Sequence, residues 1–356
     1  MRIGLYGVPT AGKTYILKKI DFIPVHVGSD LLKDYDKDFR NKDESEKEII
    51  RKEVAKRMMS EDTFIMDGHY KFGDTIAFTE EEGQMYDVYI YLYVRPDVWK
   101  DRLKESVKKS DKNSKYISYD IEKWQMDEIK ALRQYCHDNN KDFYVVDCPS
   151  EGCVKDVSIV IDFIRSIVFE GYSCVDYAKE CADKILDKNS SDIVVLCDGD
   201  KTLVTEDTSK AVLDYSTDLY DNNFYTGFQS WLQYREFERY KDFDILNIPV
   251  HFRKEIIRNF LCSDIFILTS GYDRIWKFIA NVLNCVAFCG NKMCADTKFF
   301  ITKFLQRAGK KVIAYGDSMN DYFMLKQADK AYLVRKEDGS FSRSLGNIDI
   351  GGFDYV

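Results

Sequence analysis

Residues 194–203 read Val-Val-Leu-Cys-Asp-Gly-Asp-Lys-Thr-Leu. Four residues suited to a buried strand lead directly into two aspartates, Asp198 and Asp200. Because residues i and i+2 of a strand point to the same side, both carboxylates are expected to face one crevice at the carboxyl edge of a sheet, where open α/β sheets bind ligands. Two like charges so close together repel each other, and a divalent cation relieves that repulsion. The stretch therefore predicts a strand that ends in a cation-binding pair of carboxylates.

Three further motifs follow in a fixed order. Thr269 ends a second apolar strand, Lys298 begins an amphipathic helical run, and a third apolar strand leads into Gly-Asp-Ser-Met-Asn-Asp at 316–321. This ordered set resembles the motifs of the haloacid-dehalogenase (HAD) phosphohydrolases. The Gly-Tyr-Asp at 271–273 resembles the phosphoserine-phosphatase-like branch of that family in particular. The resemblance covers roughly residues 192–345.

The resemblance implies a Rossmann-like domain over residues 192–356, with a helical cap inserted at about 204–263. Asp198 would attack phosphorus and become an aspartyl-phosphate, a known use of a carboxylate nucleophile. Asp200 would protonate the leaving oxygen and then activate water. The resemblance also assigns residues that hold phosphoryl oxygens, namely Thr269 and Lys298. It implies Mg²⁺ on a set of carboxylates: Asp198, Asp200, Asp317 and Asp321.

A second motif stands at the start of the chain. Residues 7–14, Gly-Val-Pro-Thr-Ala-Gly-Lys-Thr, satisfy GxxxxGK[ST] between a short strand and a helical run. The glycines, Gly7 and Gly12, let backbone N–H groups close around phosphate oxygens at the start of a helix. Lys13 would reach the β- and γ-phosphates, and the Thr14 hydroxyl would hold Mg²⁺. The pattern predicts a site for ATP.

The order of elements over residues 1–168 resembles small P-loop kinases of the adenylate-kinase and nucleoside-kinase type. Asp67 ends a hydrophobic strand and resembles a residue that orders Mg²⁺ through water. Arg102 lies at the nucleotide-contacting position of that family. Asp30 either orients or deprotonates an acceptor hydroxyl, or it is the N-cap of the helix that begins at Leu31.

The chain departs from the adenylate kinases after Asp67-Gly68. Their usual Phe-Pro-Arg continuation is replaced by His69-Tyr70-Lys71. The missing arginine argues against a nucleoside monophosphate as the acceptor. His69 is a candidate functional residue, and the alternative is a loop histidine without a role.

Length and composition set the frame for both halves. At 356 residues, 45% of them hydrophobic, the chain is expected to form two α/β domains with doubly wound parallel sheets. We place a kinase domain at 1–168, a connector at 169–191 and a phosphatase domain at 192–356. The sequence contains no run of 18 apolar residues, so we expect no membrane span. The ten cysteines contain no CxxC pair, which favours free thiols and a cytoplasmic protein.

We expect a bifunctional enzyme, with an ATP-dependent kinase fused to a Mg²⁺-dependent phosphatase (a transferase and a hydrolase). A small phosphorylated metabolite, nucleoside or nucleotide-like, is the favoured substrate. The alternative is a polynucleotide 5′-kinase/3′-phosphatase for RNA or DNA end repair. The net charge of −8 argues against a nucleic-acid substrate. It does not exclude one, because an acidic chain can still form a local basic groove. A third alternative is a nucleotide-gated binding module with decayed sites, which the intact motifs oppose. The sequence does not predict the oligomeric state.

Overall fold

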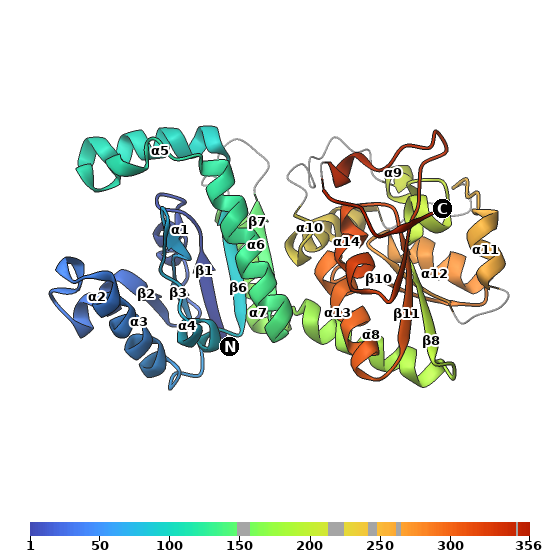
Figure 1. Cartoon of the computed structure of the whole chain (residues 1–356), viewed down its shortest axis with the longest axis horizontal. Helices are drawn as coiled ribbons and strands as arrows, with labels where there is room; N and C mark the ends of the chain where they lie inside the picture. Colours follow the sequence, from blue (N-terminus) through green and yellow to red (C-terminus); the bar gives the residue numbers. More distant parts are fainter. Residues whose placement is uncertain (148–156, 213–223, 241–247, 261–264, 347) are drawn as a thin grey trace. The chain divides into compact units, whose positions relative to one another are not determined.

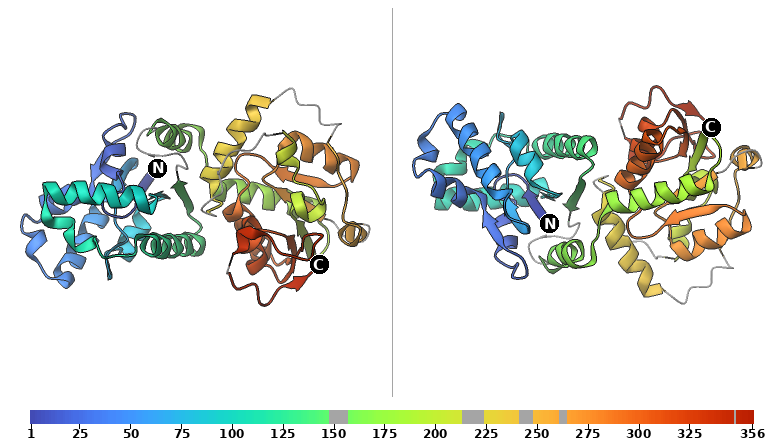
Figure 2. Two further views of the ribbon diagram at one scale, coloured as in Figure 1. Left: turned by 90° about the horizontal axis from the view of Figure 1, so that it is seen from above. Right: turned by 90° about the horizontal axis from the view of Figure 1, so that it is seen from below.

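The chain divides into two compact units, Met1–Tyr172 and Ser173–Val356 (Figure 1). Each unit is built on a parallel sheet with helices on both of its faces (Figure 2), which confirms the predicted α/β class. The computed structural model describes residues 1–147, 157–212, 224–240, 248–260, 265–346 and 348–356.

The first unit contains a sheet of five parallel strands in the order β2-β3-β1-β6-β7. These strands are β1 Arg2–Tyr6, β2 Val25–Val27, β3 Phe64–Asp67, β6 Val88–Tyr93 and β7 Asp142–Asp147. A strand covered on both faces is expected to be apolar along its whole length. The six residues of β6 are all buried, in agreement with its central place beside β1.

Helices and one short hairpin, β4 Lys71–Phe72 with β5 Thr75–Ile76, complete the first unit. The helices are α1 Lys13–Leu17, α2 Gly28–Tyr35, α3 Glu44–Met58, α4 Glu80–Met85, α5 Pro96–Lys109, α6 Ile121–Asn139 and α7 Val157–Glu170, with 3₁₀ turns η1 Phe39–Asn41 and η2 Asp111–Tyr116. The long α3 begins in a capping box, in which the Asp43 carboxylate accepts from the Glu46 N–H and Glu46 accepts from the Asp43 N–H. Such a reciprocal cap fixes where a helix begins.

The second unit contains six parallel strands in the order β10-β9-β8-β11-β12-β13. They are β8 Ile193–Cys197, β9 Ile265–Thr269, β10 Val286–Cys289, β11 Lys311–Gly316, β12 Lys330–Leu333 and β13 Asp354–Tyr355. The strand order reverses between β8 and β11. Sheets of this kind bind ligands in the crevice outside that point, at the carboxyl ends of the strands.

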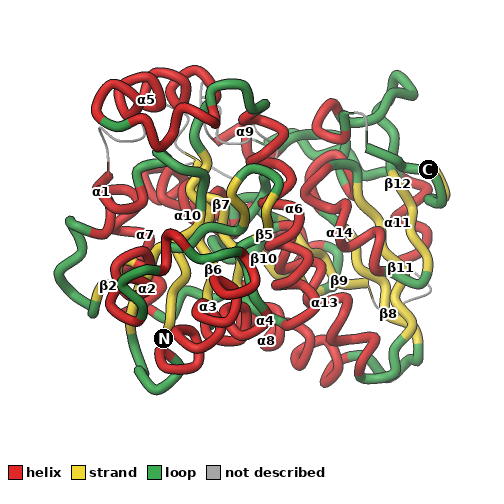
Figure 3. Tube along the Cα trace, turned by 60° about the vertical axis from the view of Figure 1, so that its left-hand side comes forward, coloured by secondary structure: helices red, strands yellow, loops and turns green. Residues whose placement is uncertain are grey.

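Helices enclose this second sheet (Figure 3). They are α8 Cys174–Lys188, α9 Thr208–Val212, α10 Gly227–Phe237, α11 Lys254–Phe260, α12 Asp273–Val282, α13 Ala295–Arg307 and α14 Met319–Gln327. Helices α8, α13 and α14 share one apolar core with the strands, and α12 belongs to a second core. The predicted cap at 204–263 is helical in α9, α10 and α11. Its residues 213–223, 241–247 and 261–263 lie outside the described part of the chain.

The predicted connector, residues 169–191, contains the helix α8. Its N-cap is Ser173, whose Oγ accepts from the Asp176 N–H at 3.0 Å. Side chains on one face of α8, including Cys181 and Ile185, are fully buried in the same core as Leu305 of α13. The helix is therefore packed as part of the second unit.

Two expectations drawn from composition concern the cysteines and membrane spans. The seven cysteines that the structure describes are free thiols, and most of them are buried. None of the helices within the described ranges is both long and apolar enough to cross a lipid bilayer.

The packing of α8 predicts how the second unit depends on it. A fragment of residues 173–356 should unfold cooperatively, whereas a fragment of residues 190–356 should be severely destabilised. Each buried aliphatic side chain such as Ile185 contributes about 1.5–3 kcal/mol, against a typical domain stability of about 5–15 kcal/mol. Thermal melts followed by circular dichroism would compare the two fragments. Equal melting temperatures would contradict the assignment of α8 to this core.

Candidate active sites

Three carboxylates lie together at the carboxyl edge of the second sheet. Asp198 follows β8, Asp317 follows β11, and Asp321 is in the first turn of α14. One oxygen from each lies within 4.8 Å of the others, and all three residues are buried. Strands β8 and β11 are direct neighbours, so the sheet itself brings these distant parts of the sequence to one place.

A buried lysine joins two of these carboxylates. The Lys298 side chain is fully buried, and its Nζ donates to Oδ1 of Asp198 and to Oδ1 of Asp321, at 2.6 Å in both cases. Burial alone would lower the pKa of Lys298, but the two carboxylates outweigh it and raise that pKa above the ordinary value. The lysine is therefore held as a cation inside the site.

Asp321 also shapes the loop that carries Asp317. Its Oδ2 accepts from the backbone N–H of Asp317 and of Ser318, at 3.2 Å each, and from the Ser318 hydroxyl at 3.0 Å. These bonds complete a capping box at the start of α14. A side chain at Gly316 would place its Cβ 2.3 Å from that of Asp321, so this turn requires a glycine.

The site holds more negative charge than its lysine can balance. Burial and then the charge of Asp321 raise the pKa of Asp198 to about 7. The pKa of Asp317 is raised well above its usual range, first by burial and then by its two carboxylate neighbours. Asp317 Oδ2 is buried and has no hydrogen-bond partner among the described residues. Carboxylate oxygens are the ligands that Mg²⁺ prefers, so Asp198, Asp317 and Asp321 fit a site for this cation.

Asp200 has different surroundings from the other predicted metal ligands. Its Oδ1 accepts from the backbone N–H of Thr208 at 2.8 Å and from the Thr208 hydroxyl at 2.6 Å. Burial and then the charge of Asp207 raise the pKa of Asp200 to about 6, against the opposing effect of the hydrogen bonds from Thr208. Its carboxylate faces the start of α9 and is not among the three grouped oxygens. Thr208 was not singled out in the sequence, because it lies outside the motifs.

The end of β9 contributes hydroxyl groups. Thr269 is buried, and its Oγ1 accepts from the Gly271 N–H at 3.0 Å. The next residue, Ser270, accepts from Nδ2 of Asn320 and donates to the Met293 carbonyl, at 2.8 Å in each case. Ser270 thus ties together three loops around the site. Its place directly after Thr269 was the one indication of it in the sequence.

The glycine-rich loop of the first unit has the geometry that its sequence predicts. Gly7 and Gly12 have φ of 147° and 107°, values that favour glycine. Lys13 lies across the loop, where its Nζ donates to the carbonyls of Gly7 and Val8. Burial lowers the pKa of Lys13 to about 8, against the charge of Asp67.

Helix α5 holds this loop in place from outside. Arg102 donates to the Ala11 carbonyl at 2.8 Å, and the indole N–H of Trp99 donates to the Pro9 carbonyl at 2.8 Å. Arg102 therefore contacts the phosphate loop, and its role in nucleotide contact stays a prediction. Trp99 is a supporting residue that no motif indicated.

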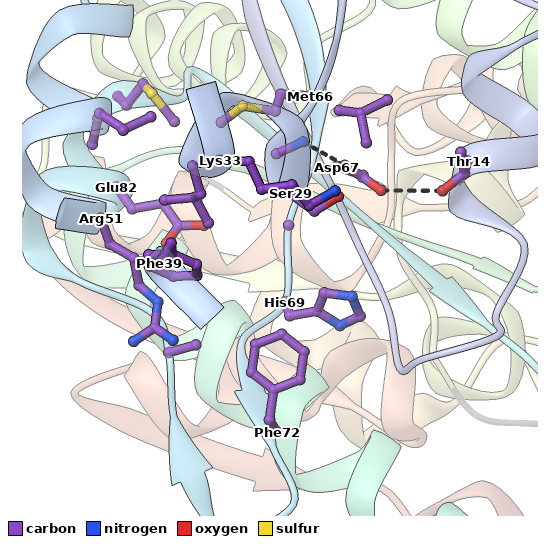
Figure 4. Close-up of a pocket in the computed structure, with 18 of the residues that line it drawn as sticks. Thr14, Ser29, Lys33, Phe39, Arg51, Met66, Asp67, His69, Phe72 and Glu82 are labelled. Atoms are coloured by element: carbon purple, nitrogen blue, oxygen red, sulfur yellow. Dashed lines mark hydrogen bonds between the residues drawn. The ribbon is translucent and has the colours of Figure 1, made fainter. Parts of the chain in front are cut away.

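Asp67 connects the phosphate loop to the next strand. Its Oδ2 accepts from the Thr14 hydroxyl at 3.4 Å, and its Oδ1 accepts from the Gly28 N–H at 2.8 Å (Figure 4). The predicted pair of Thr14 and Asp67 is thus brought together. Asp30 is instead exposed and forms an ion pair with Lys33 at 3.0 Å.

A cavity of about 310 Å³ opens beside Asp67. His69, Phe72 and Glu82 lie on its walls together with residues of α2, η1 and α3 (Figure 4). Asp30 is not one of the residues that line it. Thr14 also borders the cavity.

Comparison with solved structures finds similar folds for each half. A substrate-bound phosphoserine phosphatase shares 15% identity over 40% of this chain and 85% of its own, with a TM-score of 0.32. A HAD-family hydrolase from Salmonella enterica serovar Typhi shares 11% identity over 57% of this chain and 92% of its own, with a TM-score of 0.33. Shikimate kinase from Bacteroides thetaiotaomicron shares 14% identity over 47% of this chain and 98% of its own, with a TM-score of 0.34; this similarity covers the N-terminal part.

Comparison of the sequence gives a family for one half. No curated protein matches the sequence significantly. Residues 165–338 match the family described as haloacid dehalogenase-like hydrolase. This range includes each of the motifs that supply Asp198, Thr269, Lys298 and Asp317. The C-terminal part of the chain therefore contains a haloacid dehalogenase-like hydrolase domain, and the N-terminal part contains the GxxxxGK[ST] phosphate loop.

Proposed function

We propose that the second unit is a Mg²⁺-dependent phosphomonoesterase that uses Asp198 as its nucleophile. The observation that carries this proposal is the Asp198 carboxylate, held by Lys298 within a buried group of three carboxylates. Asp198, Asp317 and Asp321 would hold Mg²⁺, which when bound supplies positive charge against the phosphoryl oxygens. Lys298 adds a fixed cation, and Thr269 adds a hydroxyl to the same edge of the sheet.

Residues of the chain would carry out the hydrolysis of the phosphate ester in two steps. An oxygen of Asp198 forms a bond to phosphorus while the bond to the substrate's alkoxide oxygen breaks. Asp200 gives its proton to that leaving oxygen, a role that suits a carboxyl whose pKa burial raises to about 6. Asp200 then takes a proton from the water that attacks phosphorus and restores Asp198. Thr208 holds Asp200 for both steps.

We propose further that the first unit is an ATP-dependent kinase. Lys13 would neutralise the β- and γ-phosphates, and Thr14 and Asp67 would hold the accompanying Mg²⁺. Arg102 would contact the nucleotide from α5. Phosphoryl transfer depends mainly on positioning and on charge neutralisation, and these four residues supply both.

The two activities together suit a small phosphorylated metabolite of nucleoside or nucleotide type. The cavity of about 310 Å³ beside Asp67 supports a small acceptor. It gives no specific support to the alternative of polynucleotide end repair.

Replacing the nucleophile tests the phosphatase. Asp198→Asn is nearly isosteric, yet an amide is a poor nucleophile and a poor ligand for Mg²⁺, so hydrolysis of p-nitrophenyl phosphate should fall below detection. Asp183→Asn, on the exposed face of α8, is the matched control and should keep full activity. Phosphate release measured for both variants decides the matter, and full activity in Asp198→Asn would remove Asp198 from the mechanism.

The charge of the site predicts how Mg²⁺ and protons compete. An unfolded aspartate has a pKa of about 3.9, and that of Asp198 in the folded, metal-free protein is about 7. The folded state therefore binds this proton more tightly, and stability falls as the pH rises from about 4 to about 7. Mg²⁺ should consequently raise the melting temperature more at about pH 8 than at about pH 5.

Thermal shift assays with and without Mg²⁺ would measure this difference. Asp317→Asn should weaken the Mg²⁺ response at the higher pH, because it removes one of the carboxylates. A response to Mg²⁺ that is equal at both pH values would contradict the proposed ligands.

The kinase is tested at the phosphate loop. Lys13→Ala removes the cation that faces the β- and γ-phosphates, and the loss of such a transition-state interaction lowers rates by about 10²–10³-fold. Acceptor-dependent ATP turnover should fall by that factor, while phosphatase activity persists. Lys18→Ala, at an exposed position just after α1, should change neither. An unaltered ATP-dependent rate in Lys13→Ala would exclude Lys13 from the site.

A further inference from the structure

His69 lies between the phosphate loop and the cavity beside Asp67. It follows Asp67-Gly68 at the end of β3, and its ring packs over the ring of Phe72 with 4.6 Å between centroids (Figure 4). Both residues line the cavity. The side chain that replaces the adenylate-kinase phenylalanine at this position thus brings an imidazole ring to the wall of the cavity.

One of these nitrogens lacks a partner. Nδ1 of His69 is buried and has no hydrogen-bond partner among the described residues. An unpaired buried polar atom costs about 1–3 kcal/mol, and in a native structure it calls for an explanation such as a ligand. Burial, and then the charge of Lys13, lower the pKa of His69 well below its usual value. The imidazole is therefore neutral near pH 7, with one nitrogen that donates and one that accepts.

Two of the cations that line the cavity have partners within the protein. Lys33 forms an exposed ion pair with Asp30 at 3.0 Å. Arg51 lies 3.6 Å from Glu44 and also packs on the ring of Phe39.

Lys71, two residues after His69, also has partners within the protein. Lys71 pairs with Asp127 at 3.4 Å, and its backbone N–H donates to Glu128. It does not line the cavity.

The walls of the cavity indicate the rest of the acceptor. They are largely apolar, with the aromatic rings of Phe39 and Phe72 among them. A volume of about 310 Å³ is at the lower end of ligand pockets, which span about 300–1,000 Å³, and it suits a molecule of one or two rings. Glu82 adds one carboxyl to the wall, which accepts from the Tyr6 hydroxyl at 2.5 Å.

We propose that His69 is a positioning residue that hydrogen-bonds the acceptor hydroxyl, and that the acceptor is a ring-bearing alcohol of nucleoside size. This inference rests on the proposed kinase function. In the transfer, the acceptor oxygen forms a bond to the γ-phosphorus, and the bond from that phosphorus to the β,γ-bridging oxygen breaks. ADP keeps the electron pair, and the hydroxyl proton moves to an oxygen of the transferred phosphoryl group. His69 holds the hydroxyl in line without removing the proton.

Proton NMR of the imidazole rings tests the contact directly. The chain has four histidines, and the loss of one set of resonances in His69→Gln assigns His69. In the wild-type protein these resonances should not titrate between about pH 8 and pH 5, unlike an ordinary histidine with a pKa near 6.5. With MgADP bound, the addition of uridine, thymidine or adenosine should shift them. The resonances of exposed His251 should stay in place.

Binding of MgADP tests the proposed kinase function, and the response of the His69 resonances to nucleosides tests the role of His69. If MgADP does not bind the wild-type protein, the kinase function fails, and the inference fails with it. If MgADP binds but none of the three nucleosides moves the His69 resonances, the kinase function stands and the inference is wrong.

Kinetics with the nucleoside that binds provide a second test. His69→Phe keeps a ring on Phe72 but removes both nitrogens, so kcat/KM for the nucleoside should fall by about ten- to a hundredfold. The KM for ATP should stay unchanged, and His69→Gln should recover part of the loss. Full activity in His69→Phe, or an equal loss in ATP binding, would contradict a role in positioning the acceptor.

Discussion

The ion pairs of Lys298 are the constraint on which the second unit depends. One ammonium group from α13 lies 2.6 Å from two carboxylates, one directly after β8 and one in α14. Breaking a buried pair by removing one partner costs about 3–5 kcal/mol, because a charge is left without compensation inside the protein. The lysine therefore fixes the distance between Asp198, the proposed nucleophile, and the loop of Asp317. It leaves a net negative charge, which a bound cation would neutralise.

Both units form their candidate sites in the same way. A parallel sheet places the carboxyl ends of adjacent strands at one edge, so polar residues that follow different strands meet there. Thr14 in the first turn after the phosphate loop meets Asp67 at the end of β3, and Asp198 after β8 meets the loop after β11. The chemistry is local to the strand ends, while the buried strands behind them supply rigidity. This arrangement explains why an apolar run followed by a conspicuous polar residue predicted these positions from the sequence.

The sequence was less informative wherever a long-range contact decides the outcome. The strands before Asp198 and Asp317 were predictable because apolar runs of their length are characteristic of buried parallel strands. The direction of the Asp200 side chain was not, because its partner Thr208 lies in the inserted segment and carries no motif. Helix α8 was interpreted as a connector, since an amphipathic helix does not indicate which core it joins. The unpaired Nδ1 of His69 was invisible for a similar reason: the sequence shows that a histidine is present, but not that a cavity surrounds it.

The two candidate sites have opposite charge imbalances, and this difference has a chemical consequence. In the first unit, Lys13 is a buried cation whose hydrogen bonds go to neutral carbonyl groups of its own loop, and burial lowers its pKa to about 8. An anionic phosphate would supply the negative countercharge that these neutral carbonyl groups do not give Lys13. In the second unit, the carboxylates exceed the lysine, and the pKa of Asp198 is raised to about 7. A phosphate ester that approached this metal-free group would meet like charge, whereas a cation bound first would convert repulsion into attraction. The electrostatics of the first site thus favour an anion, and those of the second favour a cation.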